Sequence, residues 1–169
     1  MILKGFARRL KIDNDVNTDY IISGRYKFHI SDPRQLAKHI FEDLEENFIG
    51  RIRRGDFIVA GKNFGCGSSR EQAPLALKVA GVGAIIAISF ARIFYRNAFN
   101  LGLLLIEAQT NSIKDTEKLK INLDKGEIIK VKNNKKIRFN PLPSFAQKLL
   151  AEDGVINYFK KHGSLKIDA

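Results

Sequence analysis

Between two apolar segments the chain contains the stretch Gly61-Lys62-Asn63-Phe64-Gly65-Cys66-Gly67-Ser68-Ser69-Arg70-Glu71. The residues before it, Phe57-Ile58-Val59-Ala60, are typical of a buried strand. The residues after it, 72–80, predict a helix that ends at Gly81. The three glycines of the stretch allow the backbone to come close to a bound group. The sequence therefore predicts a strand, a glycine-rich turn and a helix in succession.

This turn is also a candidate binding site for a small anion. The first N–H groups of a helix have no internal partner and carry partial positive charge, so the start of a helix attracts anions. Ser68 and Ser69 add hydroxyls, and Arg70 adds a planar guanidinium that matches a carboxylate or a phosphate. The alternative is that Ser69 is a helix N-cap and that no ligand is bound.

The known nucleotide motifs do not fit this turn. A P-loop places Lys before its Ser or Thr, but Gly67 precedes Ser68 here. A dinucleotide-binding turn requires Gly or Ala where this chain has Arg70. The pattern therefore favours a small carboxylate over a nucleotide.

The composition is that of a globular protein. With 169 residues, 44% of them apolar, we expect one domain spanning residues 1–169. No apolar run approaches the ~20 residues of a membrane span, and the first residues lack the apolar core of a signal peptide. A lone cysteine, Cys66, forms no internal disulfide. These features predict a cytoplasmic protein.

The formal net charge of +11 raises the question of nucleic-acid binding. Much of the excess lies toward the C-terminus, where basic residues alternate with apolar ones, as solvent-facing residues of strands do. Few aromatic residues that could stack on bases lie among them. We expect a solvated face rather than a nucleic-acid site, with an acidic partner surface as the alternative. The basic residues are Lys118, Lys120, Lys125, Lys130, Lys132, Lys135, Lys136, Arg138, Lys148, Lys160, Lys161 and Lys166.

Apolar runs and turn signals predict an α/β fold. Strands are expected near residues 3–12, 57–60, 84–88 and 103–106, a hairpin over 121–131, and a further strand at 137–139. Helices are expected from Pro33 to Phe41, over 72–80 and 90–99, and over 142–159 with a break at 153–154. The fully apolar strands belong to a sheet covered on both faces. Residues 23–31 are expected to form an exposed loop.

No metal site is predicted in this chain. Residues 13–19 contain three aspartates, but they lack the central Gly and distal Glu of a calcium-binding loop. His29, His39 and His162 are scattered, and none pairs with a Cys or His at metal-ligand spacing. We expect these histidines to be surface or structural residues.

Several motifs in this order resemble those of one known family. They are Asp15-Val16-Asn17-Thr18-Asp19-Tyr20-Ile21-Ile22, the stretch from Asn63 to Glu71, the segment Ser89-Phe90-Ala91-Arg92-Ile93-Phe94-Tyr95-Arg96-Asn97, and Pro141-Leu142-Pro143. Together they extend over nearly the whole chain. On these motifs the chain resembles the small subunits of 3-isopropylmalate dehydratases, which belong to the aconitase superfamily.

The resemblance implies a fold and a partner. The fold is the swivelling β/β/α domain of that superfamily, with mixed sheet layers and flanking helices. In the two-chain hydro-lyases the small subunit completes an active site whose [4Fe-4S] cluster is carried by a large subunit. The residues agree with this independently, because a cluster needs three or four thiolates and Cys66 is the only cysteine. We therefore expect no cofactor on this chain.

The resemblance also implies roles for individual residues. Ser68 matches the serine that acts as base, Ser69 and Arg70 match positions that bind the substrate carboxylate, and Asp19 matches an acidic position near the active site. The implied reaction moves a hydroxyl between adjacent carbons of a malate-type acid by dehydration and rehydration, in leucine biosynthesis. A base must remove a proton beside a carboxylate, and a Lewis acid must help the hydroxide to leave. We expect Arg92 and Arg96, one helical turn apart, to be structural or interfacial residues, with substrate contact as the alternative.

The family selects the substrate's side arm with a loop that corresponds to residues 23–31. Its tip here is Lys27-Phe28-His29. Phe28 favours an apolar isopropyl group, so we expect isopropylmalate as the substrate. A charged arm, as in homoaconitase, or a dimethylmalate-type substrate is the alternative.

Two further features bear on this hypothesis. Gln72 stands where the family usually has histidine, which removes a titrating group near the site. The competing hypothesis belongs to a different class of function. In it the chain is a basic module that binds an anion at the same turn without catalysis.

Overall fold

The computed structural model describes residues 1–164, apart from the side chain of Lys27. Within them a mixed sheet joins seven strands in the order β4-β3-β2-β1-β5-β6-β7. Strands β1 to β4 run parallel, whereas β5, β6 and β7 continue antiparallel from β1. The strands are β1 (Ile2–Arg9), β2 (Phe57–Val59), β3 (Ala84–Ala87), β4 (Leu105–Glu107), β5 (Lys118–Asn122), β6 (Glu127–Lys130) and β7 (Lys136–Arg138).

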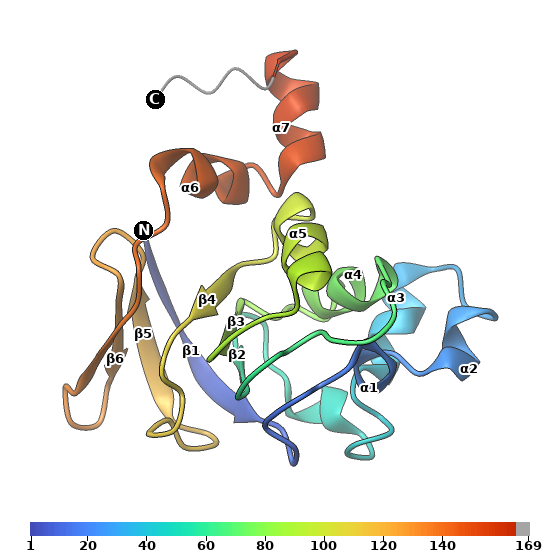
Figure 1. Ribbon diagram of the computed structural model, residues 1–169, viewed down its shortest axis with the longest axis horizontal. Coiled ribbons are helices and arrows are strands. Elements are labelled where there is room, and N and C mark those ends of the chain that lie inside the picture. Colours follow the sequence, from blue (N-terminus) through green and yellow to red (C-terminus); the bar gives the residue numbers. More distant parts are fainter. Residues whose placement is uncertain (165–169) are drawn as a thin grey trace.

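Helices connect the parallel strands and close the chain. Figure 1 shows α3, α4 and α5 to one side of the parallel strands, and α6 and α7 at the top of the view. No helix within residues 1–164 is long and apolar enough to cross a membrane. The α-helices are α1 (Thr18–Ile21), α2 (Gly24–Lys27), α3 (Pro33–Leu36), α4 (Gln72–Val79), α5 (Arg92–Asn100), α6 (Ser144–Ala151) and α7 (Val155–His162), and 3-10 helices span Ala37–His39 and Phe48–Arg51.

The parallel strands are covered on both faces, as their apolar sequences predict. Alternate residues enter two separate cores, so that Ile58 and Ile85 pack with the helices, while Phe57 and Ile86 pack with residues of the antiparallel strands. Each fully buried side chain of this size stabilises the fold by about 1.5–3 kcal/mol. The strand–helix–strand–helix–strand order predicted for residues 57–106 is confirmed.

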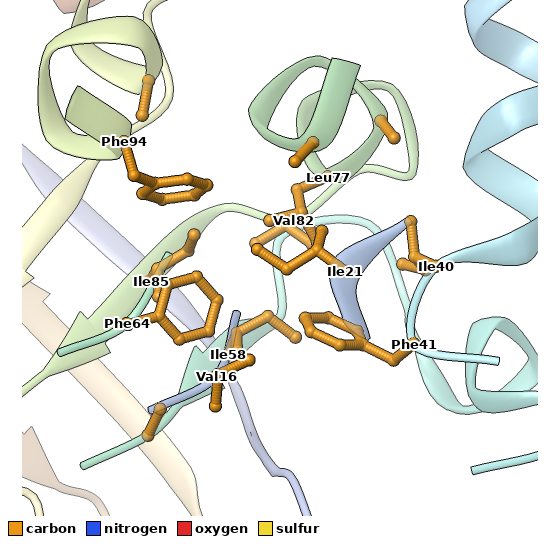
Figure 2. Close-up of a cluster of buried hydrophobic side chains, with 14 of the residues drawn as sticks. Val16, Ile21, Ile40, Phe41, Ile58, Phe64, Leu77, Val82, Ile85 and Phe94 are labelled. Carbon is orange, nitrogen blue, oxygen red and sulfur yellow. The ribbon is translucent and has the colours of Figure 1, made fainter. Parts of the chain in front are cut away.

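The helix-side core links the glycine-rich turn to the rest of the fold. Phe64, in the turn, and Phe94, on α5, meet edge to face with ring centroids 5.3 Å apart. Figure 2 shows these two rings in one cluster with Leu77 of α4 and Ile85 of β3. Because all four side chains are nearly or fully buried, the turn is held against both helices.

The predicted hairpin is present, with β5 and β6 paired antiparallel from Leu119↔Lys130 to Asn122↔Glu127. One residue of the expected basic face is placed differently. Lys130 is 7% exposed, and its ammonium donates to the carbonyl of Ser112 at 2.5 Å and pairs with Glu117 at 3.2 Å. Its solvated position was wrongly predicted, because strand alternation puts it on the buried face beside an acidic partner.

Three local expectations are corrected. The first strand ends at Arg9 rather than near residue 12, since its partner β2 ends at Val59, opposite Arg9. The helix expected to reach Phe41 stops at Leu36 and continues only as a short 3-10 helix. Phe41 adopts a φ of 57°, and its N–H donates to the carbonyl of Ile21 instead of continuing the helix. The segment expected to be a loop over residues 23–31 contains the one-turn helix α2.

Candidate functional site

The glycine-rich turn lies against the segment that precedes α1. The N–H of Gly65 donates to the carbonyl of Val16 at 2.7 Å, and the N–H of Thr18 donates to the carbonyl of Cys66 at 2.9 Å. Gly65 has a φ of 82°, and a Cβ there would come within 2.2 Å of the Phe94 ring. Only glycine meets both conditions, so the close packing of the turn depends on it.

The two serines lie in the turn and do not begin the helix. Helix α4 starts at Gln72, its N-cap is Glu71, and that residue makes no side-chain capping bond. Ser68 and Ser69 are exposed, and within the described residues their hydroxyls form no hydrogen bond. The interpretation of Ser69 as a simple N-cap, and our placement of both serines at the helix start, are therefore wrong.

Backbone donors in the turn are available to an anion. Within residues 1–164, the N–H groups of Ser68, Ser69 and Arg70 donate to no acceptor. N–H groups left without partners carry partial positive charge, and several that follow one another form a site for an anion. The anion site predicted from the sequence therefore stays a prediction, and its donors would be residues just before the helix.

Arg70 is held by the segment that ends α1. Its guanidinium forms an ion pair with the carboxylate of Asp19 and donates to the carbonyl of Ile22 at 3.1 Å. The Arg70 side chain is only 12% exposed, and its buried Nε has no partner within the described residues. The guanidinium thus holds one carboxylate in this chain and retains an unused donor.

A cavity of about 250 Å³ opens beside the turn. Ser68, Ser69 and Arg70 line it from the turn, and Arg92 and other residues of α5 also line it. A volume of this order suits a small organic acid rather than a nucleotide. The structure therefore brings Ser68, Ser69 and Arg70 to one cavity, whereas Asp19 does not line it and only forms an ion pair with Arg70.

The sequence did not identify two residues that line this cavity, Thr18 and Asn97. Both come from segments whose overall resemblance was noted, but neither carries a chemical signal on its own. Asn97 lies one residue beyond Arg96, which is exposed and does not line the cavity. A polar side chain on the otherwise apolar inner side of α5 is the signal that could have found it.

The predicted specificity residues are not brought to the cavity. Phe28 is 80% exposed, His29 is exposed, and neither lines the cavity. The side chain of Lys27 lies outside the described part of the chain. Selection of the substrate arm by these residues therefore stays a prediction.

The segment before these residues is anchored by aromatic and charged contacts. Tyr26 stacks on His39 with ring centroids 3.9 Å apart, and His39 Nδ1 lies 2.7 Å from Glu42 Oε2. The hydrogen bond with His39 lowers the pKa of Glu42, and the hydrogen bond with Glu42 raises the pKa of Tyr26. Arg25 forms an ion pair with Asp43.

Cys66 lies half-buried within the turn. Burial and, to a smaller extent, the negative charge of Asp15 raise the pKa of its thiol, so the thiol is protonated at neutral pH. Within residues 1–164, no three His, Cys, Asp or Glu side chains gather in a group that could hold a metal ion. The described part of the chain therefore provides no ligand set for an iron–sulfur cluster.

Comparison with known proteins gives consistent results. The family model of the aconitase C-terminal domain matches residues 33–111. A 3-isopropylmalate dehydratase small subunit of Archaeoglobus fulgidus is 50% identical over 98% of this chain and 100% of its own length. The methanogen homoaconitase small subunit of Methanocaldococcus jannaschii is also 50% identical, over 95% of this chain and 93% of its own.

A solved structure matches the fold. The crystal structure of 3-isopropylmalate dehydratase from Methanocaldococcus jannaschii superimposes with a TM-score of 0.89 at 48% identity, covering 96% of each chain. The aconitase-like α/β fold, with its mixed sheet and flanking helices, is thereby confirmed.

Proposed function

Because the chain belongs to the 3-isopropylmalate dehydratase small subunits of the aconitase superfamily, we propose that it is half of a hydro-lyase that interconverts 2-isopropylmalate and 3-isopropylmalate in leucine biosynthesis. The observation that carries the proposal is the meeting of Ser68, Ser69 and Arg70 at one small cavity. A non-catalytic anion-binding module does not account for a match to these subunits along nearly the whole chain.

Ser68 is the proposed base. Its exposed hydroxyl lines the cavity without an internal hydrogen bond, so it is available to a substrate carbon. As an alkoxide it would take the proton from the carbon beside a carboxylate, while the hydroxyl on the neighbouring carbon leaves. Water then adds back with the hydroxyl on the carbon that lost the proton and the hydrogen on its neighbour, which gives the isomer. The unpartnered N–H groups of the turn would stabilise the alkoxide, since a free serine is a very weak base.

Arg70 and Ser69 are proposed to bind a substrate carboxylate. The guanidinium of Arg70 already holds one carboxylate, that of Asp19, beside the cavity. A substrate carboxylate would take the place of Asp19, because a planar guanidinium binds carboxylates through two parallel donors. Asp19 therefore keeps Arg70 oriented while the site is empty.

A large subunit is the proposed partner, and we assign the [4Fe-4S] cluster to it. The described residues offer no ligand set for a cluster, whereas the small-subunit names of the relatives imply a second chain. We propose that the chain acts as one swivelling domain, in the cytoplasm, and that the partner covers the open cavity. The steps assigned to this chain concern only the proton and the carboxylates.

Homoaconitase is the second candidate, because a homoaconitase small subunit is as similar as the first dehydratase relative. The two substrates differ in the arm that the Lys27–His29 segment is proposed to meet. An exposed Phe28 favours the apolar isopropyl arm, and neither neighbouring position carries the arginine that suits a carboxylate.

The test is a substrate comparison with the assembled enzyme. The chain is mixed with its large subunit, the cluster is reconstituted without oxygen, and turnover of isopropylmalate, homocitrate and dimethylmalate is followed. We expect turnover of isopropylmalate by the pair and none by either subunit alone. Preferred turnover of homocitrate would establish the second candidate, and an assembled pair inactive on all three acids would refute the proposal.

A further inference from the structure

We propose that Thr18 is a positioning residue for the base, an inference that rests on the proposed function. Its hydroxyl donates to the carbonyl of Ser68 at 2.7 Å, and its backbone N–H donates to the carbonyl of Cys66 at 2.9 Å. Thr18 thus holds the carbonyls on both sides of Gly67. Thr18 is 2% exposed, and its bond to the exposed Ser68 is partly buried.

The turn is fixed at Phe64 and Gly65, but the part around Ser68 has fewer supports. Gly67 has a φ of 86°, and an added Cβ there would make only ordinary contacts, at 3.4 Å or more, with Asn17 and Thr18, so the packing there is looser than at Gly65. Within the described residues the bond from Thr18 is the only hydrogen bond formed by Ser68. Removing the Thr18 hydroxyl would therefore release the Ser68 carbonyl.

One hydrogen bond is enough to orient the group, because a peptide unit is planar and trans. When the Ser68 carbonyl points to Thr18, the N–H of Ser69 in the same unit points to the opposite side. The same plane sets the direction of the Cα–Cβ bond of Ser68 and hence the region that its hydroxyl can reach. Thr18 therefore controls both the base and an anion donor without touching the reacting atoms.

The test uses the assembled pair with Thr18→Val, which keeps the side-chain shape and removes the donor. We expect kcat to fall about 10- to 100-fold, the range for a displaced catalytic group, with KM changed less than threefold. Thr18→Ser keeps the hydroxyl and should restore most of kcat. The matched control is Thr110→Val, since the buried Thr110 hydroxyl also donates to a carbonyl, that of Ala60, at 2.8 Å, away from the serines.

A merely structural role predicts a different pattern. In that case Thr18→Val and Thr110→Val would lower the urea midpoint of unfolding and kcat alike. An unchanged kcat in Thr18→Val, or an equal loss in Thr110→Val, would overturn the proposal.

A second readout does not depend on activity. In ¹⁵N NMR spectra of the full-length small subunit, Thr18→Val should shift or broaden the amide signals of Ser68 and Ser69, and Thr110→Val should not. Unchanged Ser68 and Ser69 signals in Thr18→Val would overturn the proposal even if the wild-type pair were inactive. A wild-type pair inactive on every acid, with these signals shifted, would refute the proposed function and leave Thr18 as the support of the turn.

Discussion

The guanidinium of Arg70 is almost buried, and it binds the Asp19 carboxylate and the Ile22 carbonyl at once. Both contacts are made by one guanidinium nitrogen, Nη1. A planar fork serves several acceptors in fixed directions, whereas an ammonium group is a flexible point charge. The shape of the group, as well as its charge, should therefore matter for substrate binding.

Arg70→Lys should accordingly weaken substrate binding. A hydrogen bond to a charged group contributes about 1.5–3 kcal/mol, so we expect KM to rise roughly 10- to 150-fold. Steady-state kinetics of the assembled pair measure this. Arg96→Lys is the control. Arg96 is exposed on α5, a helix that contributes residues to the cavity, but Arg96 itself does not line the cavity. Equal KM values for the two variants would contradict the assignment of Arg70.

Cys66 should react slowly with alkylating agents. Burial and the charge of Asp15 raise its thiol pKa, which keeps the reactive thiolate scarce at neutral pH. We expect iodoacetamide labelling of the isolated chain at pH 7 to be slower than that of a free thiol, and to accelerate as the pH passes the raised pKa. Asp15→Asn should speed labelling, since removing the negative charge lowers the pKa. Labelling as fast as that of free cysteine at pH 7 would show that this environment is wrong.

At the scale of elements, the junction of the turn with α5 sets the geometry of the site. Gly65 lies against Phe94 so closely that no side chain fits, and residues of both the turn and α5 line the cavity. A change at this single contact should therefore disturb both walls of the cavity.

Gly65→Ala should strongly destabilise the fold. The left-handed backbone alone costs about 1–2 kcal/mol for alanine, and the clash with Phe94 adds about 1–3 kcal/mol. The control is Gly163→Ala, because Gly163 also has a positive φ, of 70°, but has no atom within 4 Å of an added Cβ. Urea unfolding should give a clearly larger loss for Gly65→Ala, and equal losses would contradict the packing described for the turn.

The parallel half of the fold could be predicted because its sequence signals are local. Segments such as 84–87 are apolar throughout, and glycines mark where the helices end. The one-turn helices α1 and α2 could not be predicted, since four residues do not show a helical period. Phe41 illustrates the same limit, because a buried contact with a distant segment, and not its neighbours in sequence, decides its conformation.

The candidate site shows the same division. Ser68, Ser69 and Arg70 lie in one motif and could be recognised together. Thr18 and Asn97 could not, because only the tertiary fold brings α1 and α5 to the turn. The position of Phe28 outside the cavity could not be predicted from residues 23–31 either. The segment before Phe28 is held by the stacking of Tyr26 on His39, a residue outside that loop.

At the scale of the whole molecule, the cavity is open and its rim carries an exposed apolar side chain. Ile93 lines the cavity and is 56% exposed. If the large subunit covers the cavity, as proposed above, Ile93 is placed to contact it. This is the face on which we expect the large subunit to bind.

Ile93→Asp should weaken the complex. A carboxylate placed in a dry interface loses its hydration without gaining a partner, so we expect the Kd for the large subunit to rise at least about tenfold. Val131→Asp is the control, because Val131 is 45% exposed but follows β6 in the antiparallel half of the sheet. Calorimetric titration of both variants measures the difference, and the same Kd for both would place the interface elsewhere.

The role of Ser68 is tested by the turnover of isopropylmalate by the assembled pair carrying Ser68→Ala, with assembly checked by sedimentation. Removal of a general base lowers rates about 10²- to 10⁴-fold. We predict an intact complex whose kcat falls within or below this range. An intact complex with kcat within tenfold of the wild-type value would contradict the assignment of Ser68 as the base.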